Sequence, residues 1–277
     1  MQSSNPVLTR YEKNDKSGFA YDEGVSAYAQ AASGGAAAAD LSMATSAAAP
    51  GTGARLTIND VVVKTGLIFI VCVVFAVAGY KLVDTAPWIM WVGMIGGLVL
   101  GFVNALKKVP SPPLILLYAV LQGIFVGAIS NWYNAYATSS QYGGIILQAV
   151  VATMTTFGIM LALYVTGIVK VTKRFQSVMI VALVSYMVLG LASLIAALFG
   201  VGGGWGFYGV SGIGLIICVV GVLLAAFFLM LDFEAISQGI KMGAPERESW
   251  RMAFGLLMTL IWLYLEFLRL LAIFSRN

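Results

Sequence analysis

The sequence predicts an all-α membrane protein with seven transmembrane helices. Of the 277 residues, 60% are hydrophobic and 10% are charged, whereas soluble domains carry about 25% charged residues. Seven continuous apolar runs follow one another along the chain, and crossing a bilayer takes about 20 such residues. The runs lack the period-two alternation of an outer-membrane barrel, so helices are the spanning structure.

The N-terminal segment has a different composition. Ala, Gly and Ser dominate residues 25–53, where Asp40 is the only charged residue. Such a segment cannot bury a core, so residues 1–56 are expected to form a disordered cytoplasmic tail. No apolar stretch follows its early charges, which argues against a signal peptide. Residues 57–277 are expected to form the transmembrane domain, and removal of the residues before Leu56 is expected to leave insertion unchanged.

Caps, turns and breakers set the expected helix boundaries. Thr57, Asn59 or Asp60 could cap the first helix. Prolines within 110–113 begin the third helix, and the polar–aromatic stretch 131–136 suits the membrane interface beyond it. The predicted helices are 61–83, 88–106, 113–131, 145–169, 177–199, 209–242 and 251–275.

Basic residues in the short loops predict the orientation. They gather on the side of the N-terminal tail, and Lys81 alone lies in the opposite loops. The positive-inside rule then places the N-terminus in the cytoplasm and the C-terminus outside, in a plasma or bacterial inner membrane. The cytoplasmic loops carry Lys107, Lys108, Lys170, Lys173, Arg174, Lys241, Arg247 and Arg251.

The absence of histidine excludes several functions. With no histidine in the sequence, there can be no His-ligated zinc, no HExxH metalloprotease site, no Ser–His catalysis and no histidine pH sensor. Cys72 and Cys218 lie within apolar runs and suit packing better than a disulfide. The net charge of +4 is scattered between the runs, so nucleic acid is not an expected partner. We therefore expect a non-enzymatic protein whose first partner is the lipid bilayer.

Two charges interrupt the last apolar run. Glu266 and Arg269 lie well inside residues 252–274, and ionisable groups at membrane depth normally face a protein interior or a wet cavity. Spaced i and i+3, the two side chains could simply neutralise each other on one helix face. Alternatively, Glu266 has a functional partner elsewhere in the chain.

Asp232 is the candidate partner, because it is the first charge after the sixth apolar run. Asp232 and Glu234 could begin the cytoplasmic loop. The helix could instead continue to the turn at 243–245, with Asp232 about 15 Å inside that turn. The last two helices would then form a hairpin with an acid on each limb, and two facing carboxylates can share a proton or hold a hard cation. Residues 243–251 are expected to form a partly ordered loop.

Four short segments stand out within the seven-helix pattern: 231–233 (LDF), 263–268 (LYLEFL), 111–113 (SPP) and 122–127 (QGIFVG). Together they resemble the Bax inhibitor-1 (TMBIM) family, which includes bacterial YccA-like proteins. The similarity covers residues 56–277 and implies a Bax inhibitor-1-like bundle.

The resemblance implies a pH-sensitive calcium leak in which an acid pair on the last two helices senses protons. Asp232 matches the first acid, and Glu266 stands where the family usually has aspartate. These two residues are the expected ligands for calcium, which is the transported or bound ion rather than a resident cofactor. Glu234 and Arg269 are expected to support the site, and Arg276 matches a basic residue near the end of the family's last helix.

Two departures keep a second function open. Asp232 and Glu266 are 34 residues apart, more than in the calcium-leak members. The run 88–106 lacks the arginine that those members pair with the first acid, and Asn104 is its only strongly polar residue. The alternative is a non-conducting regulator that binds other membrane proteins, such as quality-control proteases. A separation of the two carboxylates beyond about 10 Å would favour it.

Overall fold

The computed structural model describes residues 54–138, 144–200, 206–208 and 212–275. Within these ranges, seven helices are long and apolar enough to cross a membrane. The β-structure in the described ranges consists of the isolated bridge between Arg55 and Pro245. The predicted fold class, an all-α protein with seven transmembrane helices, is confirmed.

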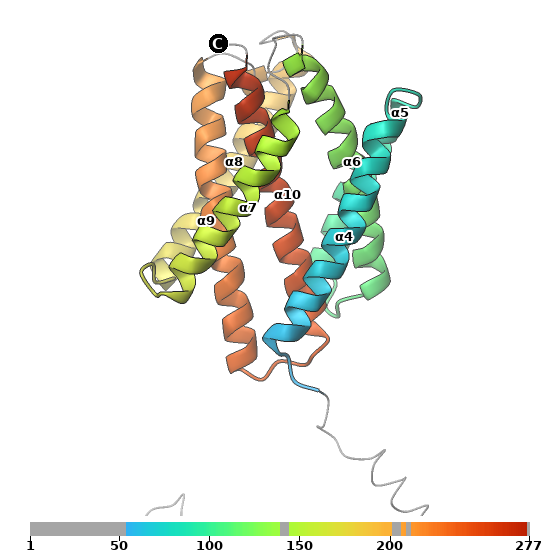
Figure 1. The fold of residues 1–277 in the computed structure, drawn as a ribbon. Coiled ribbons are helices and arrows are strands. Elements are labelled where there is room, and N and C mark those ends of the chain that lie inside the picture. Colours follow the sequence, from blue (N-terminus) through green and yellow to red (C-terminus); the bar gives the residue numbers. More distant parts are fainter. Residues whose placement is uncertain (1–53, 139–143, 201–205, 209–211, 276–277) are drawn as a thin grey trace, which may run out of the picture. The chain divides into compact units, whose positions relative to one another are not determined.

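Successive helices run in opposite directions along the bundle (Figure 1). We call the end that holds the connection between the last two helices (242–247) the hairpin end, and the opposite end the C-terminal end. The helices are α4 (Ile58–Leu82), α5 (Trp88–Leu106), α6 (Pro112–Thr138), α7 (Ile145–Val165), α8 (Lys173–Leu198), α9 (Gly212–Lys241) and α10 (Glu248–Phe274), with a 3-10 turn η2 (Gly206–Tyr208).

Several helix boundaries differ from the predicted ones: α4 and α10 begin three residues earlier, and α7 ends at Val165 rather than at 169. Two further differences, in α6 and α8, have visible reasons. α6 continues to Thr138 through the polar stretch that was expected to lie beyond it. Its amides are satisfied there by the end of α4, since Asn131 Nδ2 donates to the Tyr80 carbonyl at 3.0 Å and Asn134 Nδ2 to the Tyr80 hydroxyl at 3.3 Å. α8 begins earlier than expected, at Lys173, because the Thr172 hydroxyl caps it.

Residues 54–57, which we call the strap, belong to the folded domain. Leu56 N donates to the Ala244 carbonyl and Glu246 N donates to the Ala54 carbonyl, both at 2.8 Å. Leu56 is 3% exposed. Of the three cap candidates, Thr57 caps α4 through a capping box with Asp60. The expected tail boundary at residue 56 is therefore too late for the described part of the chain, and the remainder of that expectation, residues 1–53, lies outside it.

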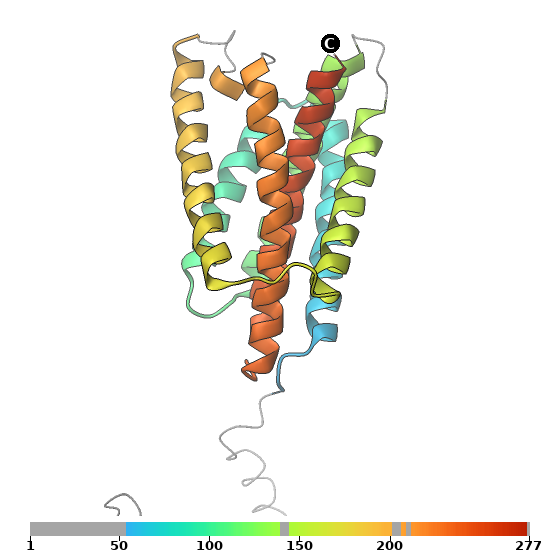
Figure 2. The same ribbon diagram turned by 90° about the vertical axis from the view of Figure 1, so that its left-hand side faces the viewer.

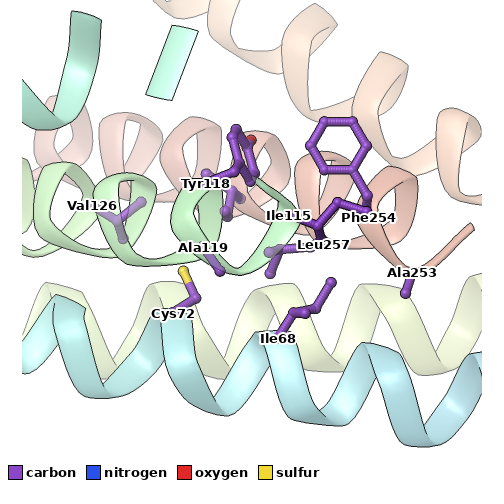
Figure 3. Close-up of a cluster of buried hydrophobic side chains, with 10 residues drawn as sticks. Ile68, Cys72, Ile115, Tyr118, Ala119, Val126, Ala253, Phe254 and Leu257 are labelled. Carbon is purple, nitrogen blue, oxygen red and sulfur yellow. The ribbon is translucent and has the colours of Figure 1, made fainter. Parts of the chain in front are cut away.

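α10 runs through the middle of the bundle and contacts α4, α6, α7 and α9 (Figures 1 and 2). One core cluster joins it to α4 and α6 (Figure 3). Gly123 and Gly127 allow α6 to approach α4 very closely. A Cβ on Gly123 would overlap the Cys72 carbonyl, and a Cβ on Gly127 would overlap the Ala76 carbonyl. The labelled core residues are Ile68, Cys72, Ile115, Tyr118, Ala119, Val126, Ala253, Phe254 and Leu257.

Candidate functional site: two acids on the α9–α10 hairpin

Asp232 lies within a helix rather than at the start of a loop. α9 continues to Lys241, nine residues beyond Asp232, which is about 14 Å at the helical rise. Of the two alternatives left open by the sequence, the structure therefore has the extended helix. A carboxylate at this depth needs partners that the neighbouring helix must supply.

The neighbours of Asp232 on α10 are Gly255 and Thr259. A Cβ built on Gly255 would lie 3.6 Å from Asp232 Oδ1, and the Thr259 side chain lies beside the carboxylate and donates to the Gly255 carbonyl at 3.2 Å. Asp232 Oδ2 is buried and has no hydrogen-bond partner in the described part of the chain. The ion pairs found there are Lys64–Glu246, Arg251–Glu248 and Arg269–Glu266, so none of them neutralises Asp232.

Glu266 is in the opposite situation, since both of its carboxylate oxygens are engaged. The Tyr186 hydroxyl donates to Oε1 at 2.6 Å, and Trp262 Nε1 donates to the same oxygen at 3.3 Å. Arg269 Nη2 lies 3.1 Å from Oε2. The Cys218 thiol donates to the main-chain carbonyl of Glu266 at 3.2 Å. These groups come from α8, α9 and α10, so Glu266 joins three helices.

The structure does not bring the two acids together, and the expectation of a facing carboxylate pair is corrected. Glu266 packs opposite Gly221 of α9, whereas Asp232 packs opposite Gly255 of α10. On each helix these two levels are eleven residues apart, or about 16 Å. The connection at 242–247 is short, so the extra residues between the acids lengthen the helices rather than a loop. Glu266 therefore lies farther from the hairpin end than Asp232 does.

Glu234, expected to support the acid pair, lies on another face of α9. Its Oε2 accepts a hydrogen bond from the Tyr164 hydroxyl of α7 at 2.9 Å, and its Oε1 accepts one from Gln238 Nε2 at 2.8 Å. Glu234 thus connects α9 to α7. Arg269, the other expected support, is the ion-pair partner of Glu266, as the i and i+3 spacing allowed.

Asn104 does not replace an arginine beside Asp232. It is buried, and its Nδ2 donates to the Leu100 and Leu114 carbonyls at 2.9 and 3.2 Å. This amide therefore ties α5 to the first turn of α6. Arg276, the remaining candidate, lies outside the described residues.

A family model described as Bax inhibitor 1 like matches residues 5–276. The chain belongs to the Bax inhibitor 1 like family. The family resemblance is confirmed, and the match begins well before the motif-bearing part of the sequence. A comparison with curated proteins finds no matching relative.

Sequence reasoning missed most of the groups that hold Glu266 in this Bax inhibitor 1 like protein. Trp262 could have been found, because it lies four residues before Glu266 and so on the same helix face. Tyr186 and Cys218 come from other helices, and nothing in their apolar surroundings connects them with Glu266. Only the packing of α8 and α9 reveals them.

The hairpin end of the bundle is more ordered than expected. Lys64 Nζ lies 2.8 Å from Glu246 Oε1 and donates to Ser249 Oγ at 2.7 Å. Arg247 Nε donates to the Pro110 carbonyl at 3.2 Å. Ser249 is fully buried. The segment 243–251, expected to be a partly ordered loop, is instead fixed to α4 and to the α5–α6 connection.

The described residues contain no group of three or more His, Cys, Asp and Glu side chains that could hold a metal ion. Calcium takes about 6–8 oxygen ligands. An ion at Asp232 would therefore be held by this carboxylate, nearby hydroxyl or main-chain oxygens, and water.

Proposed function

We propose that this Bax inhibitor 1 like protein is a proton-sensitive cation leak that passes calcium, with Asp232 as the ionisable group on the ion path. The observation that carries the proposal is that the buried Oδ2 of Asp232 has no hydrogen-bond partner among the described residues. This oxygen belongs to a carboxylate inside a membrane-spanning helix, with no described counter-charge. Ionisable groups in that situation mark ion or proton pathways.

The chemistry of Asp232 suits transient binding. A hard cation such as calcium prefers oxygen ligands, and Asp232 offers two, with the Thr259 side chain beside them. The shortage of protein ligands makes the affinity modest, which allows the ion to leave. A proton competes for the same carboxylate oxygens, so calcium passage is expected to fall as the pH falls.

Glu266 has a different part in this proposal. Its oxygens are already bonded to Tyr186, Trp262 and Arg269. We therefore assign it the task of holding α8, α9 and α10 in position. It influences the ion path through that packing and not by sharing an ion with Asp232.

Calcium entry into liposomes that contain an internal indicator tests the proposal. Wild-type protein is expected to pass calcium faster as the pH is raised. Asp232→Asn keeps the size of the side chain and removes its titration, so it should slow passage and flatten the pH response. Glu234→Gln is the matched control, because Glu234 lies two residues away on the same helix and bonds to Tyr164 instead. Wild-type protein that passes no calcium at any pH would refute the leak.

The alternative is a non-conducting regulator that binds other membrane proteins. The observation that favours it is the separation of Asp232 from Glu266, together with the complete bonding of Glu266. Under this alternative the acids stabilise the bundle. The liposome assay distinguishes the two functions, because a regulator gives no calcium flux with wild-type protein or with either variant.

We further propose that the hairpin end faces the cytoplasm of a plasma or inner membrane. The basic residues of the three connections at this end support that orientation. A single cysteine at position 242 provides the test, because Met242 is 77% exposed whereas Ser249 is buried. Cys72 and Cys218 are both buried, so background labelling is expected to be low. Reaction of Met242→Cys with an impermeant thiol reagent outside intact cells would reverse the orientation.

A further inference from the structure

A cavity of about 590 Å³ lies between α4, α6, α7 and α10. Its inner wall includes Cys72, Val126, Leu260 and Ile261, which are all buried. These residues lie within four helices that are long and apolar enough to span the bilayer. The volume falls in the range of about 300–1,000 Å³ that is typical of ligand pockets.

The hydroxyl groups in the cavity wall already have partners. Ser130 donates to the Val126 carbonyl at 2.5 Å and bonds to the Tyr264 hydroxyl at 2.8 Å. Thr153 donates to the Ala149 carbonyl at 2.7 Å. The Tyr80 hydroxyl, at one end of the cavity, accepts from Asn134 Nδ2. Apart from these hydroxyl groups, the described lining side chains are apolar. The occupant must therefore be apolar.

The cavity reaches the side of the bundle between α4 and α7. The α4 residues Val73 and Val77 line it and are 44% and 54% exposed. The α7 residues Val150 and Met154 also line it and are 40% and 39% exposed. Because these four side chains lie within membrane-spanning segments, their exposed surface faces lipid. The opening between α4 and α7 is thus an entrance from the bilayer.

We propose that this cavity binds one acyl chain of a membrane phospholipid, which enters between α4 and α7. Wall atoms that face an empty space lose their dispersion contacts, so a filled cavity is more stable. The bilayer supplies acyl chains at this depth, and a flexible chain can follow an irregular wall. The occupied site would place a lipid against Tyr264 and Ile261 of the central helix α10.

The polar end of the lipid also has a place in the structure. Tyr80 lines the cavity near the C-terminal end of α4, and its hydroxyl accepts from Asn134 Nδ2. Asn131 Nδ2 lies 3.3 Å from Asp84 Oδ2 beside it. Amide and phenol groups of this kind suit the interfacial zone of a bilayer. The bound lipid therefore belongs to the leaflet at the C-terminal end.

A phosphatidylcholine with a photoactivatable group in one acyl chain tests the proposal on the full chain in nanodiscs. Labelling is mapped by peptide analysis, and α8 serves as the internal reference for ordinary lipid contact, since its exposed residues include Val181, Val184 and Val188. Labelling of α4 and α7 is expected to exceed that of α8. It should also saturate as the probe fraction rises, whereas labelling of α8 should rise in proportion.

Two pairs of adjacent valines offer matched variants. Val73→Trp with Val150→Trp fills the cavity and should reduce the labelling of α4 and α7 to the level of α8. Val74→Trp with Val151→Trp is the control, because these neighbours are 58% and 56% exposed and are not among the lining residues. The control should label like wild type.

Three outcomes would overturn the lipid site. If the labelling of α4 and α7 rises in proportion to the probe fraction, without saturation, these helices make only ordinary lipid contact. This outcome is read from the wild-type protein alone. Equal labelling of the two double variants shows that the cavity does not hold the chain. Cross-linking of a second protein copy to α4 or α7, in place of lipid, shows that a protein side chain occupies the opening.

Discussion

The two carboxylates within the α9–α10 pair differ in how many hydrogen-bond and ion-pair partners they have. Toward the C-terminal end, Glu266 bonds to Tyr186, Trp262 and Arg269. Toward the hairpin end, Asp232 keeps one buried oxygen without a partner. A buried acid can therefore connect several helices, as Glu266 does, or keep an oxygen without a hydrogen-bond partner, as Asp232 does.

The comparison predicts that Arg269→Met has the largest effect on stability. Removing one partner of a buried ion pair leaves a buried charge without compensation, which costs about 3–5 kcal/mol. The side chains of Arg269 and Glu266 are 12% and 7% exposed. The free energy of unfolding in detergent micelles is the measurement, and adding Glu266→Gln should recover part of the loss.

Arg251→Met is the control with an exposed pair, and it also removes exposed hydrogen bonds from Arg251 Nη2 to the Lys107 and Lys108 carbonyls. Its pair with Glu248 has the same i and i+3 spacing, but the side chains are 42% and 29% exposed. Exposed pairs contribute about 0–1 kcal/mol. Equal effects of Arg251→Met and Arg269→Met would show that the Glu266 cluster does not fasten the helices.

The second largest loss of stability is expected from the strap, which holds the hairpin end through a buried side chain rather than through an ion pair. Leu56→Ala is expected to cost about 2–4 kcal/mol, since Leu56 is 3% exposed. Leu82→Ala, at a leucine that is 53% exposed, should cost much less. Thermal unfolding compares the two variants.

Truncation provides a second test of the strap. A chain that starts at Ala54 should have the same melting temperature as wild type, whereas a chain that starts at Ile58 should melt at a lower temperature. Equal melting temperatures of the two chains would contradict a structural strap.

Gly221 and Gly255 allow the packing around Glu266 and around Asp232 to be compared, with smaller expected effects on stability. A Cβ on Gly221 would overlap the Tyr186 hydroxyl and lie 2.7 Å from Glu266 Cδ, so Gly221→Ala is expected to cost about 1–3 kcal/mol. A Cβ on Gly255 would be in ordinary contact with Asp232, at 3.6 Å from Oδ1. Gly255→Ala should therefore be neutral or slightly stabilising, because alanine favours a helix by up to about 1 kcal/mol. Unfolding in micelles measures both, and a reversed order would mean that the Asp232 level is the tighter one.

Asp232→Asn is expected to change stability least. Asp232 has no described ion pair to lose, so the change should stay below about 1 kcal/mol, the net value of one hydrogen bond. The same unfolding measurement applies. A loss as large as that of Arg269→Met would mean that Asp232 is structural after all.

The fold could be predicted from the sequence because a bilayer imposes a simple length rule on helices. The predicted helix 88–106 has the same bounds as α5 (Trp88–Leu106). The largest error at a helix boundary arose where a distant side chain decides it. Asn131 is polar in the sequence, yet it lies within α6 because the end of α4 accepts its hydrogen bond. Sequence spacing contains no information of that kind.

The candidate site was predictable in its residues and not in its geometry. Asp232 and Glu266 stood out because charge is rare in apolar runs. Their relative depth depends on where the hairpin turns, and a turn at 242–247 with long helices on both sides places their levels about 16 Å apart along the helices. The strap could not be foreseen either, since Ala54 and Leu56 join the fold through main-chain hydrogen bonds.

α8 differs from the other helices in how little of it touches protein. Ser193 is its one buried residue, and the structure describes all of this helix. Transmembrane helices adjust their tilt to the thickness of the surrounding hydrocarbon, and a helix with few protein contacts is the freest to do so. Tyr186 lies on α8 and donates to Glu266. A change in the tilt of α8 would therefore act on Glu266 through this hydrogen bond, and on Trp262 through its ring contact with Tyr186.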